Sequence, residues 1–394
     1  AARSVAKVLD QLNLKYERTE KTKAPSFTKN FFKKASHPVL KLIHNARVAN
    51  KARTTFIQSI YRYVHKGKIH ADINQLRSEY GGTITGRFSY RHPNLQQLPA
   101  KGDMGNQLRS IFIPNSEKEK WGCFDYSQQE PRLVVHYATL KKLMGTDQFV
   151  QSYHKDKNTD FHEIVGDIAK IPRDQAKTIN LGKFYGMGKA KLQAELGVSK
   201  DRADEIIKQY EKSVPFVKQL TYQVSDKAQE RGFITTLLDR RCRFPKYEPV
   251  LRGSDWGTFV PVEDEERMQE LQRMGKFLKD DEGNILTDSE EKPKRNYWHN
   301  NPTRRAFTYK ALNKLIQGSA ADMTKKAMVD LYKENIIPLI QIHDELNISI
   351  ESKEQADKIK KIMEETVELE VPNKVDYESG SHWGAIEEEK NGKN

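Results

Sequence analysis

The stretch QIHDELNISI, residues 341–350, alternates apolar side chains in the pattern that predicts a half-buried β-strand. The even-numbered residues are apolar except for Asp344, which takes one of their places. An unpaired carboxylate is costly to bury, so the charges of this run need a partner. If IHDEL forms the tip of a hairpin, Asp344 stands at the end of a strand, between His343 and Glu345.

A second carboxylate follows another strand-like segment. FDYSQQE, residues 124–130, places Asp125 at the end of a predicted strand that leads into a helix. Carboxylates at adjacent strand ends commonly hold Mg²⁺, because hard cations prefer oxygen ligands. Asp125 and Asp344 are therefore candidate metal ligands, but 219 positions separate them and the sequence alone does not show that they meet.

Composition limits the class of protein. The chain has 394 residues, enough for two or three packed subdomains, and a formal net charge of +13. It has no apolar run of about 18 residues and no signal-like start, so we expect an intracellular protein of the cytoplasm, a DNA-containing organelle or an infected host cell, not a secreted one. Two distant cysteines predict neither a disulfide framework nor a zinc site. The start at Ala rather than Met leads us to expect a fragment of a longer chain.

The positive charge gathers near the N-terminus. Ten basic residues follow one another there without an acid between them: Lys29, Lys33, Lys34, Lys41, Arg47, Lys51, Arg53, Arg62, Lys66 and Lys68. Such a stretch repels itself unless a polyanion lies against it, which favours a nucleic-acid partner. A merely basic, soluble surface is the alternative. Apolar spacing over residues 37–64 predicts a long basic helix or helix pair.

RDQAKTINLGKFYG, residues 173–186, aligns four side chains. On a helix, residues 173, 177, 181 and 185 form one stripe, here Arg, Lys, Leu and Tyr. The two cations could grip a polyphosphate while the tyrosine stacks on a base; the alternative is a solvated basic face with a tyrosine in the core.

Residues 160–230 are predicted to be almost wholly helical. Residues 245–301 are acidic and irregular, as in an inserted surface lobe with little order, in which residues 265–278 could form a short helix.

These motifs occur in an order that resembles a known family. DYSQQEPR at 125–132, RDQAKTINLGKFYG at 173–186 and IHDE at 342–345 resemble motifs A, B and C of the family A DNA polymerases, the DNA polymerase I-like enzymes. Four further segments are similar to the family: TGRFSYRHPNLQQLP at 85–99, TTLLDRRCRFP at 235–245, LIQGSAADMTKKAM at 315–328 and SGSHWG at 379–384. The likeness covers about residues 1–390 apart from the insertion.

The resemblance implies an α+β fold of right-hand polymerase architecture, with an antiparallel palm sheet and helical fingers and thumb. We expect a lead-in and basic thumb at 1–75, a first palm part at 76–150, fingers at 151–232, and a second palm part at 233–394 that contains the acidic insertion at about 245–301. The implied enzyme is a DNA-directed DNA polymerase, a nucleotidyltransferase of replication or repair. It would extend a primer on a DNA template with deoxynucleotides and two Mg²⁺ ions, which Mn²⁺ can replace. We expect a monomer without membrane contact and without a proofreading exonuclease in this chain.

The resemblance also implies which residues carry the reaction. The metal ligands and catalytic groups would be Asp125, the carbonyl of Tyr126, Asp344, Lys177 and Glu345. Lys177 would neutralise or protonate the leaving group, and Glu345 would support the site rather than ligate strongly.

A further set would bind the nucleotide and the DNA. The nucleotide would be contacted by Arg173, Lys177, His162, Leu181, Tyr185, Glu130 and Gln129. The DNA would be contacted by Arg87, Arg109, Asn313, Gln317 and His343. Glu130 matches the family's steric gate, a side chain beneath the sugar that leaves no space for a 2′-hydroxyl. Leu181 departs from the usual Phe or Tyr, and with the insertion it indicates a viral, phage or otherwise divergent member.

Two other functions stay open. A single-subunit RNA polymerase shares the palm chemistry, but Glu130 argues against it. A catalytically inactive DNA-binding homologue would keep the basic surface. The retention of Asp125, Asp344 and Lys177 argues against that, because a carboxylate pair destabilises the fold and would serve no purpose in a catalytically inactive homologue.

Overall fold

The computed structural model describes residues 2–19, 22–28, 31–32, 36–79, 81–100, 102–251, 259–288 and 291–388. The chain divides into two compact units, Ala1–Asp72 with Tyr90–Arg109, and Ile73–Ser89 with Ser110–Asn394. Three residues of the basic stretch, Lys29, Lys33 and Lys34, lie outside the described residues. No described helix is both long and apolar enough to cross a membrane.

The first unit is mainly helical. Helix α3 (Pro38–Lys51) continues through a π-helical segment, η1 (Ala52–Ile57), into α4 (Gln58–Arg62), so the predicted basic helix is one continuous run. Pro38 suits its first turn because proline lacks the N–H that would stay unpaired there. A small core of Leu9, Phe32 and Leu40 joins α3 to α1 (Ala2–Gln11). The remaining elements in this part of the chain are β1 (Glu17–Arg18), β2 (Pro25–Ser26), β3 (Val64–His65), β4 (Lys68–Ile69), β5 (Asp72–Asn74), β6 (Ser89–Arg91), η2 (Leu95–Gln97) and α5 (Asp103–Arg109).

The second unit is built on a five-stranded antiparallel sheet with the order β12-β13-β7-β14-β15. Its strands are β7 (Lys120–Tyr126), β12 (Ile340–Ile342), β13 (Glu345–Ile350), β14 (Val375–Gly380) and β15 (Glu387–Glu388). IHDEL forms the tip of the β12–β13 hairpin, with Ile342 opposite Glu345. His343 adopts a left-handed conformation, φ 56°, in the turn.

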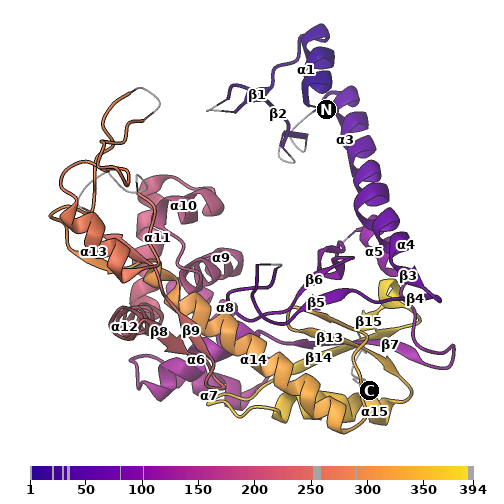
Figure 1. Cartoon of the computed structure of the whole chain (residues 1–394). Coiled ribbons are helices and arrows are strands. Elements are labelled where there is room, and N and C mark those ends of the chain that lie inside the picture. The colour runs from indigo at the N-terminus through magenta and orange to yellow at the C-terminus, as the bar shows by residue number, and fades with distance from the viewer. Residues whose placement is uncertain are drawn as a thin grey trace. The chain divides into compact units, whose positions relative to one another are not determined.

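Helices cover the sheet and extend beyond it (Figure 1). Helix α15 (Lys353–Glu365) packs on β13 and β14, and the long α14 (Ala311–Lys333) packs on α15 and on α6 (Gln129–Leu140). The other helices here are α7 (Asp147–Lys155), α8 (Phe161–Ala169), α9 (Arg173–Phe184), α10 (Lys189–Leu196), α11 (Lys200–Ser213) and α12 (Pro215–Arg231). One continuous apolar core, which includes Phe124, Phe161 and Leu346, joins the sheet to these helices. The mixture of helices and an antiparallel sheet confirms the predicted α+β class.

The insertion is folded where it is described, in contrast to the irregular lobe expected from the sequence. Strand β10 (Tyr247–Pro249) pairs with β11 (Thr303–Arg305), and α13 (Glu265–Arg273) lies between them in the chain. Met268, Leu271 and Trp298 form a small separate core. The buried Asn296 side chain donates to the carbonyls of Leu271 and Gly275 at 2.6 and 2.8 Å. The insertion therefore has a small core of its own, separate from the main apolar core. The remaining elements are β8 (Phe233–Thr235), β9 (Arg241–Arg243), η3 (Thr308–Lys310) and η4 (Trp383–Ala385).

Candidate active site

Asp125 and Asp344 lie side by side in the structure. Asp125 on β7 is paired in register with Glu345 on β13, and Asp344 immediately precedes Glu345. The N–H of Tyr126 donates to the Asp344 carbonyl at 3.4 Å. Antiparallel pairing thus brings together two strand ends that are far apart in the chain, and both carboxylates belong to the same compact unit.

These carboxylates repel one another. Desolvation at the strand end, followed by repulsion from Asp344, Glu345 and Asp376, raises the pKa of Asp125 to about 8, although its side chain still reaches solvent. Burial also raises the pKa of Asp344 and outweighs the attraction of the Arg87 guanidinium. Asp376, which is opposite Asp125 on β14, had no signal in the sequence. A cation at this edge of the sheet would relieve the repulsion and favour the ionised carboxylates.

The donor set suits an ion that is shared with a substrate. Among the described residues, no three His, Cys, Asp or Glu side chains are grouped to hold a metal. Mg²⁺ usually takes one or two carboxylates together with waters and substrate phosphates, so the Asp125 and Asp344 pair fits it. Tyr126 has only its main chain to offer, because its buried hydroxyl donates to the Met363 carbonyl at 2.7 Å.

Glu130 is the centre of a second group. It lies in the first turn of α6 and is 8% exposed. Arg87 donates to one carboxylate oxygen at 2.8 Å and the Tyr185 hydroxyl donates to the other at 2.8 Å. Burial raises the pKa of Glu130, whereas Arg87 and Tyr185 oppose that rise. Gln317 on α14 is hydrogen-bonded to Tyr185, so residues from three other segments hold this carboxylate in place, two directly and one through Tyr185.

Arg173 is positioned by Asp160, a residue that the sequence analysis missed. Asp160 caps α8 by accepting from the N–H groups of His162 and Glu163 at 2.7 and 3.2 Å, and it accepts from Arg173 Nε at 2.9 Å. Burial alone would raise the pKa of Asp160, but these hydrogen bonds outweigh it and lower the pKa. An Asp just before a helical run is an N-cap signal, so this residue could have been found from the sequence.

His162 is buried and held by a chain of hydrogen bonds. The Tyr210 hydroxyl donates to Asn180 Oδ1 at 2.7 Å, and Asn180 Nδ2 lies 2.9 Å from His162 Nδ1. Because the Asn180 amide donates to Nδ1, the ring proton is assigned to Nε2. Burial, reinforced by the charges of Lys177 and Arg173, lowers the pKa of His162 to about 4. The ring is therefore neutral at pH 7.

Gln128 ties the start of α6 to the start of α8. Its backbone is left-handed, φ 52°, at the N-cap of α6. Its side-chain amide donates to the Thr159 carbonyl at 3.1 Å and accepts from the Phe161 N–H at 2.8 Å. This link connects the end of the strand that carries Asp125 with the start of α8, the helix that carries His162.

The other predicted residues occupy varied places. Asn313 is half-buried on α14, one turn before Gln317, and Leu181 is half-buried on α9. Gln129 is 3% exposed and its amide donates to a main-chain carbonyl of α14 at 3.3 Å, so its side chain faces that helix. His343 is exposed in the hairpin turn. Arg109 belongs to the other unit, where its Nε donates to the Pro99 carbonyl at 3.1 Å.

Comparison with known proteins identifies related chains. A DNA-directed DNA polymerase of Pseudomonas phage M6 is 32% identical over 96% of this chain and 56% of its own length. DNA polymerase I of Geobacillus stearothermophilus is 30% identical over 88% of this chain and 35% of its own length. The chain thus spans about half or less of these relatives.

A solved structure shares the fold. It is the POL domain of Pol1 from M. smegmatis in complex with DNA primer-template and dNTP, which matches with a TM-score of 0.69 and 24% identity, over 96% of this chain and 60% of that chain. The model of the family described as DNA polymerase family A matches residues 2–385. With a match over nearly its whole length and the corresponding fold, this chain belongs to DNA polymerase family A.

Proposed function

We propose that the chain catalyses template-directed DNA synthesis, adding deoxynucleotides to a primer 3′-hydroxyl in the 5′ to 3′ direction. The observation that carries the proposal is the meeting of Asp125 and Asp344 at adjacent strand ends, with mutual repulsion that a cation would relieve. Family membership and the named activities of the relatives support the reaction class.

Asp125, the Tyr126 carbonyl and Asp344 would hold two Mg²⁺ ions, or Mn²⁺ in their place. When bound, the ions lower the pKa of the attacking hydroxyl and stabilise charge on the phosphates. Asn347 donates to the Glu345 carboxylate at 2.6 Å, which keeps Glu345 beside the pair as a supporting group.

Residues of α8 and α9 would bind the phosphates of the incoming nucleotide. Asp160 holds the Arg173 guanidinium, which remains half exposed and available to a phosphate. His162 can donate from Nε2 without adding a charge. Lys177, one turn along α9 from Arg173, would neutralise or protonate the departing pyrophosphate.

The Glu130 group would select the sugar. A buried carboxylate that is fixed by Arg87 and Tyr185 cannot swing aside easily, so a 2′-hydroxyl would meet a rigid obstacle. Tyr185 and Leu181 would border the new base pair and its sugar. DNA would be contacted by Arg87, Arg109, Asn313, Gln317 and His343. In this proposal the first unit contributes the basic thumb and the second contributes palm and fingers.

Extension of a labelled primer on a DNA template with Mg²⁺ tests the proposal. We expect extension with deoxynucleotides, little with ribonucleotides, and none in an Asp344→Asn variant that still binds duplex DNA. Efficient ribonucleotide use would indicate an RNA polymerase. Duplex binding without extension in the wild-type chain would show a catalytically inactive DNA-binding homologue and refute the proposal.

A further inference from the structure

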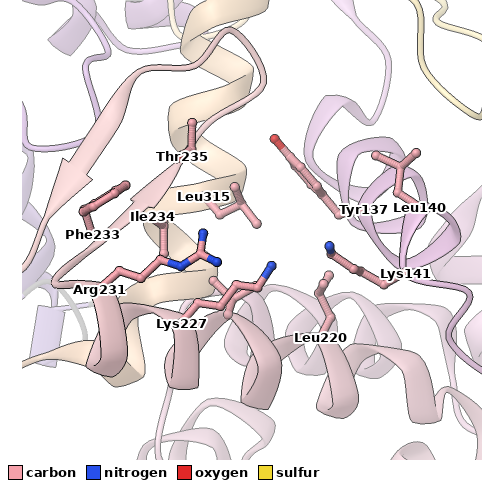
Figure 2. A pocket seen from close by; sticks show the side chains of 11 residues that line it. Tyr137, Leu140, Lys141, Leu220, Lys227, Arg231, Phe233, Ile234, Thr235 and Leu315 are labelled. Atoms are coloured by element: carbon pink, nitrogen blue, oxygen red, sulfur yellow. The ribbon is translucent and has the colours of Figure 1, made fainter.

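A pocket of about 230 Å³ lies between α6, α12, β8 and α14, and none of the residues that line it belongs to the proposed active site (Figure 2). Its floor is aliphatic. Leu220, Val224, Ile234 and Leu315 line it and are 2%, 8%, 6% and 5% exposed. Such a surface offers an apolar group a preformed place out of water.

Three basic side chains surround this floor. Lys141 follows the end of α6, and Lys227 and Arg231 are one turn apart on α12. Figure 2 shows the three reaching over the pocket from its two sides. Within the part of the chain that the structure describes, none of them forms an ion pair with an acid. The basic side chains that form this rim above the apolar floor are thus not engaged in ion pairs with described acids.

The rim charges disfavour one another. Desolvation, followed by the charge of Lys141 and that of Arg231, lowers the pKa of Lys227, and Glu230 opposes this shift only in part. Carboxylates placed at the rim would remove this repulsion, so the pocket is complementary in charge to an anion.

The lining also limits what the apolar part of that anion is. Two side-chain hydroxyls line the pocket, those of Tyr137 and Thr235. The Tyr137 hydroxyl is already hydrogen-bonded to Ser319 at 2.7 Å. On the aliphatic floor itself a nucleobase would find no side-chain partner for its polar edge, and an unpaired buried polar group is costly. An aliphatic or aromatic side chain has no such edge.

We propose that this pocket docks an acidic peptide segment of a partner protein, with one apolar side chain on the aliphatic floor and flanking carboxylates against Lys141, Lys227 and Arg231. The site is separate from the proposed catalytic groups, so docking and synthesis occur on different surfaces of the same unit. A partner held here would stay attached while the active site is occupied.

Fluorescence polarisation with a dye-labelled synthetic peptide, one phenylalanine flanked by aspartates and glutamates, tests the inference on the full chain. We expect saturable binding that weakens at high salt, and at least about a fivefold loss of affinity in a Lys141→Gln/Lys227→Gln variant. A Lys208→Gln/Lys212→Gln variant removes two exposed charges from α11 and serves as the matched control, with unchanged affinity. A peptide with glycine in place of phenylalanine should bind much more weakly.

The remaining outcomes refute the proposal. Equal affinity in both double variants would show that the rim does not bind the peptide. If dye-labelled single-stranded DNA binds wild type and loses affinity in the Lys141→Gln/Lys227→Gln variant while the peptide does not, the surface is a nucleic-acid contact. Absence of peptide binding to wild type also overturns it. Thermal melting of each variant shows that a loss of affinity is not a loss of fold.

Discussion

Asp125 and Asp344 carry charges that their surroundings oppose, since the pKa of each is raised. A carboxyl group whose pKa is raised by folding keeps its proton to a higher pH than in the unfolded chain, so the free energy of unfolding falls as the pH rises above 3.8, the ordinary pKa of the group. A bound divalent cation reverses this effect. The feature that destabilises the protein without metal is therefore also the feature that would make a metal site.

Calcium binding measured by thermal melting tests this without relying on activity. We expect Ca²⁺ to raise the melting temperature of wild type, by about 1–2 °C for each kcal/mol of stabilisation in a chain of this length. Asp344→Asn should raise the melting temperature in EDTA and lose most of the Ca²⁺ response. Glu378→Gln, which removes a more distant carboxylate, is the control and should keep the response. An equal Ca²⁺ response in Asp344→Asn would place the ion elsewhere.

Replacing Glu130 should relax sugar selection. Glu130→Ala removes the carboxylate that Arg87 and Tyr185 hold, and we expect the preference for deoxynucleotides over ribonucleotides to fall by about 10- to 200-fold, as for one group in a selective pocket. Steady-state insertion of each nucleotide opposite one template base gives the ratio. Tyr185→Phe keeps the carboxylate and should change the ratio much less. An unchanged ratio in Glu130→Ala would assign the selection to another residue.

His162 gives a pH dependence of stability with a definite sign. Its pKa is about 4 in the folded protein and 6.5 in the ordinary case, so the unfolded chain binds the proton first as pH falls. Unfolding then takes up a proton, and His162 should lower stability progressively between about pH 6.5 and pH 4. Urea unfolding across this range should show a smaller decline in His162→Gln than in wild type. Parallel declines would mean that the ring is not held neutral.

The pair of helices α8 and α9 shows how one cap residue serves two elements. Asp160 ends the loop before α8 with side-chain hydrogen bonds to two N–H groups and at the same time binds Arg173 in the first turn of α9. The orientation of the guanidinium is thus coupled to the start of the neighbouring helix. A helix cap contributes about 1 kcal/mol to stability, so Asp160 stabilises α8 while it orients Arg173.

Variants at position 160 separate the cap from the ion pair. Asp160→Asn keeps a side-chain acceptor for α8 but loses the charge, so the KM for deoxynucleotide should rise while stability changes little. Asp160→Ala should raise KM and also lose about 1 kcal/mol. Ser199→Ala removes the cap of α11, where Ser199 accepts from the Arg202 N–H at 3.3 Å, and should lose stability without a change in KM. An unchanged KM in both position-160 variants would contradict the positioning role.

The insertion is a separate lobe within the molecule. Its own core and the short β10–β11 ribbon mean that the main apolar core does not depend on it. Its 13 acidic and 9 basic residues over positions 245–301 also set it apart from a chain of net charge +13. A module with these properties can be removed without exposing the main core.

Excision of the lobe tests this independence. Replacing residues 251–301 with Asn-Gly would join the ends of the β10–β11 ribbon, where the Val250 N–H donates to the Pro302 carbonyl at 2.7 Å. Asn-Gly suits a two-residue hairpin turn. We expect a folded protein with primer extension within about threefold of wild type, measured at equal concentration. Loss of the main thermal transition would show that the lobe supports the core.

The helical region 160–230 and the hairpin around Asp344 were predicted from the sequence, because helical periodicity, strand alternation and motif order are local patterns. The family was predicted correctly for the same reason. The short helix of the insertion was predicted and is present as α13, but the packing of the insertion was not, because its core joins α13 to Trp298, which lies far along a polar segment with no strong period. Long-range packing outweighed local composition there.

For the candidate site, the sequence predicted the residue types and the order of the motifs, and its local pattern also indicated the N-cap at Asp160. Tertiary structure alone brought Asp125 to Asp344 across β7 and β13, set Asp376 opposite Asp125, and linked Tyr210 through Asn180 to His162. Strand register and buried hydrogen bonds join residues that are distant in sequence, and their pKa shifts arise from burial and neighbouring charge. The strand register, the buried hydrogen bonds and the pKa shifts are therefore properties of the folded chain alone.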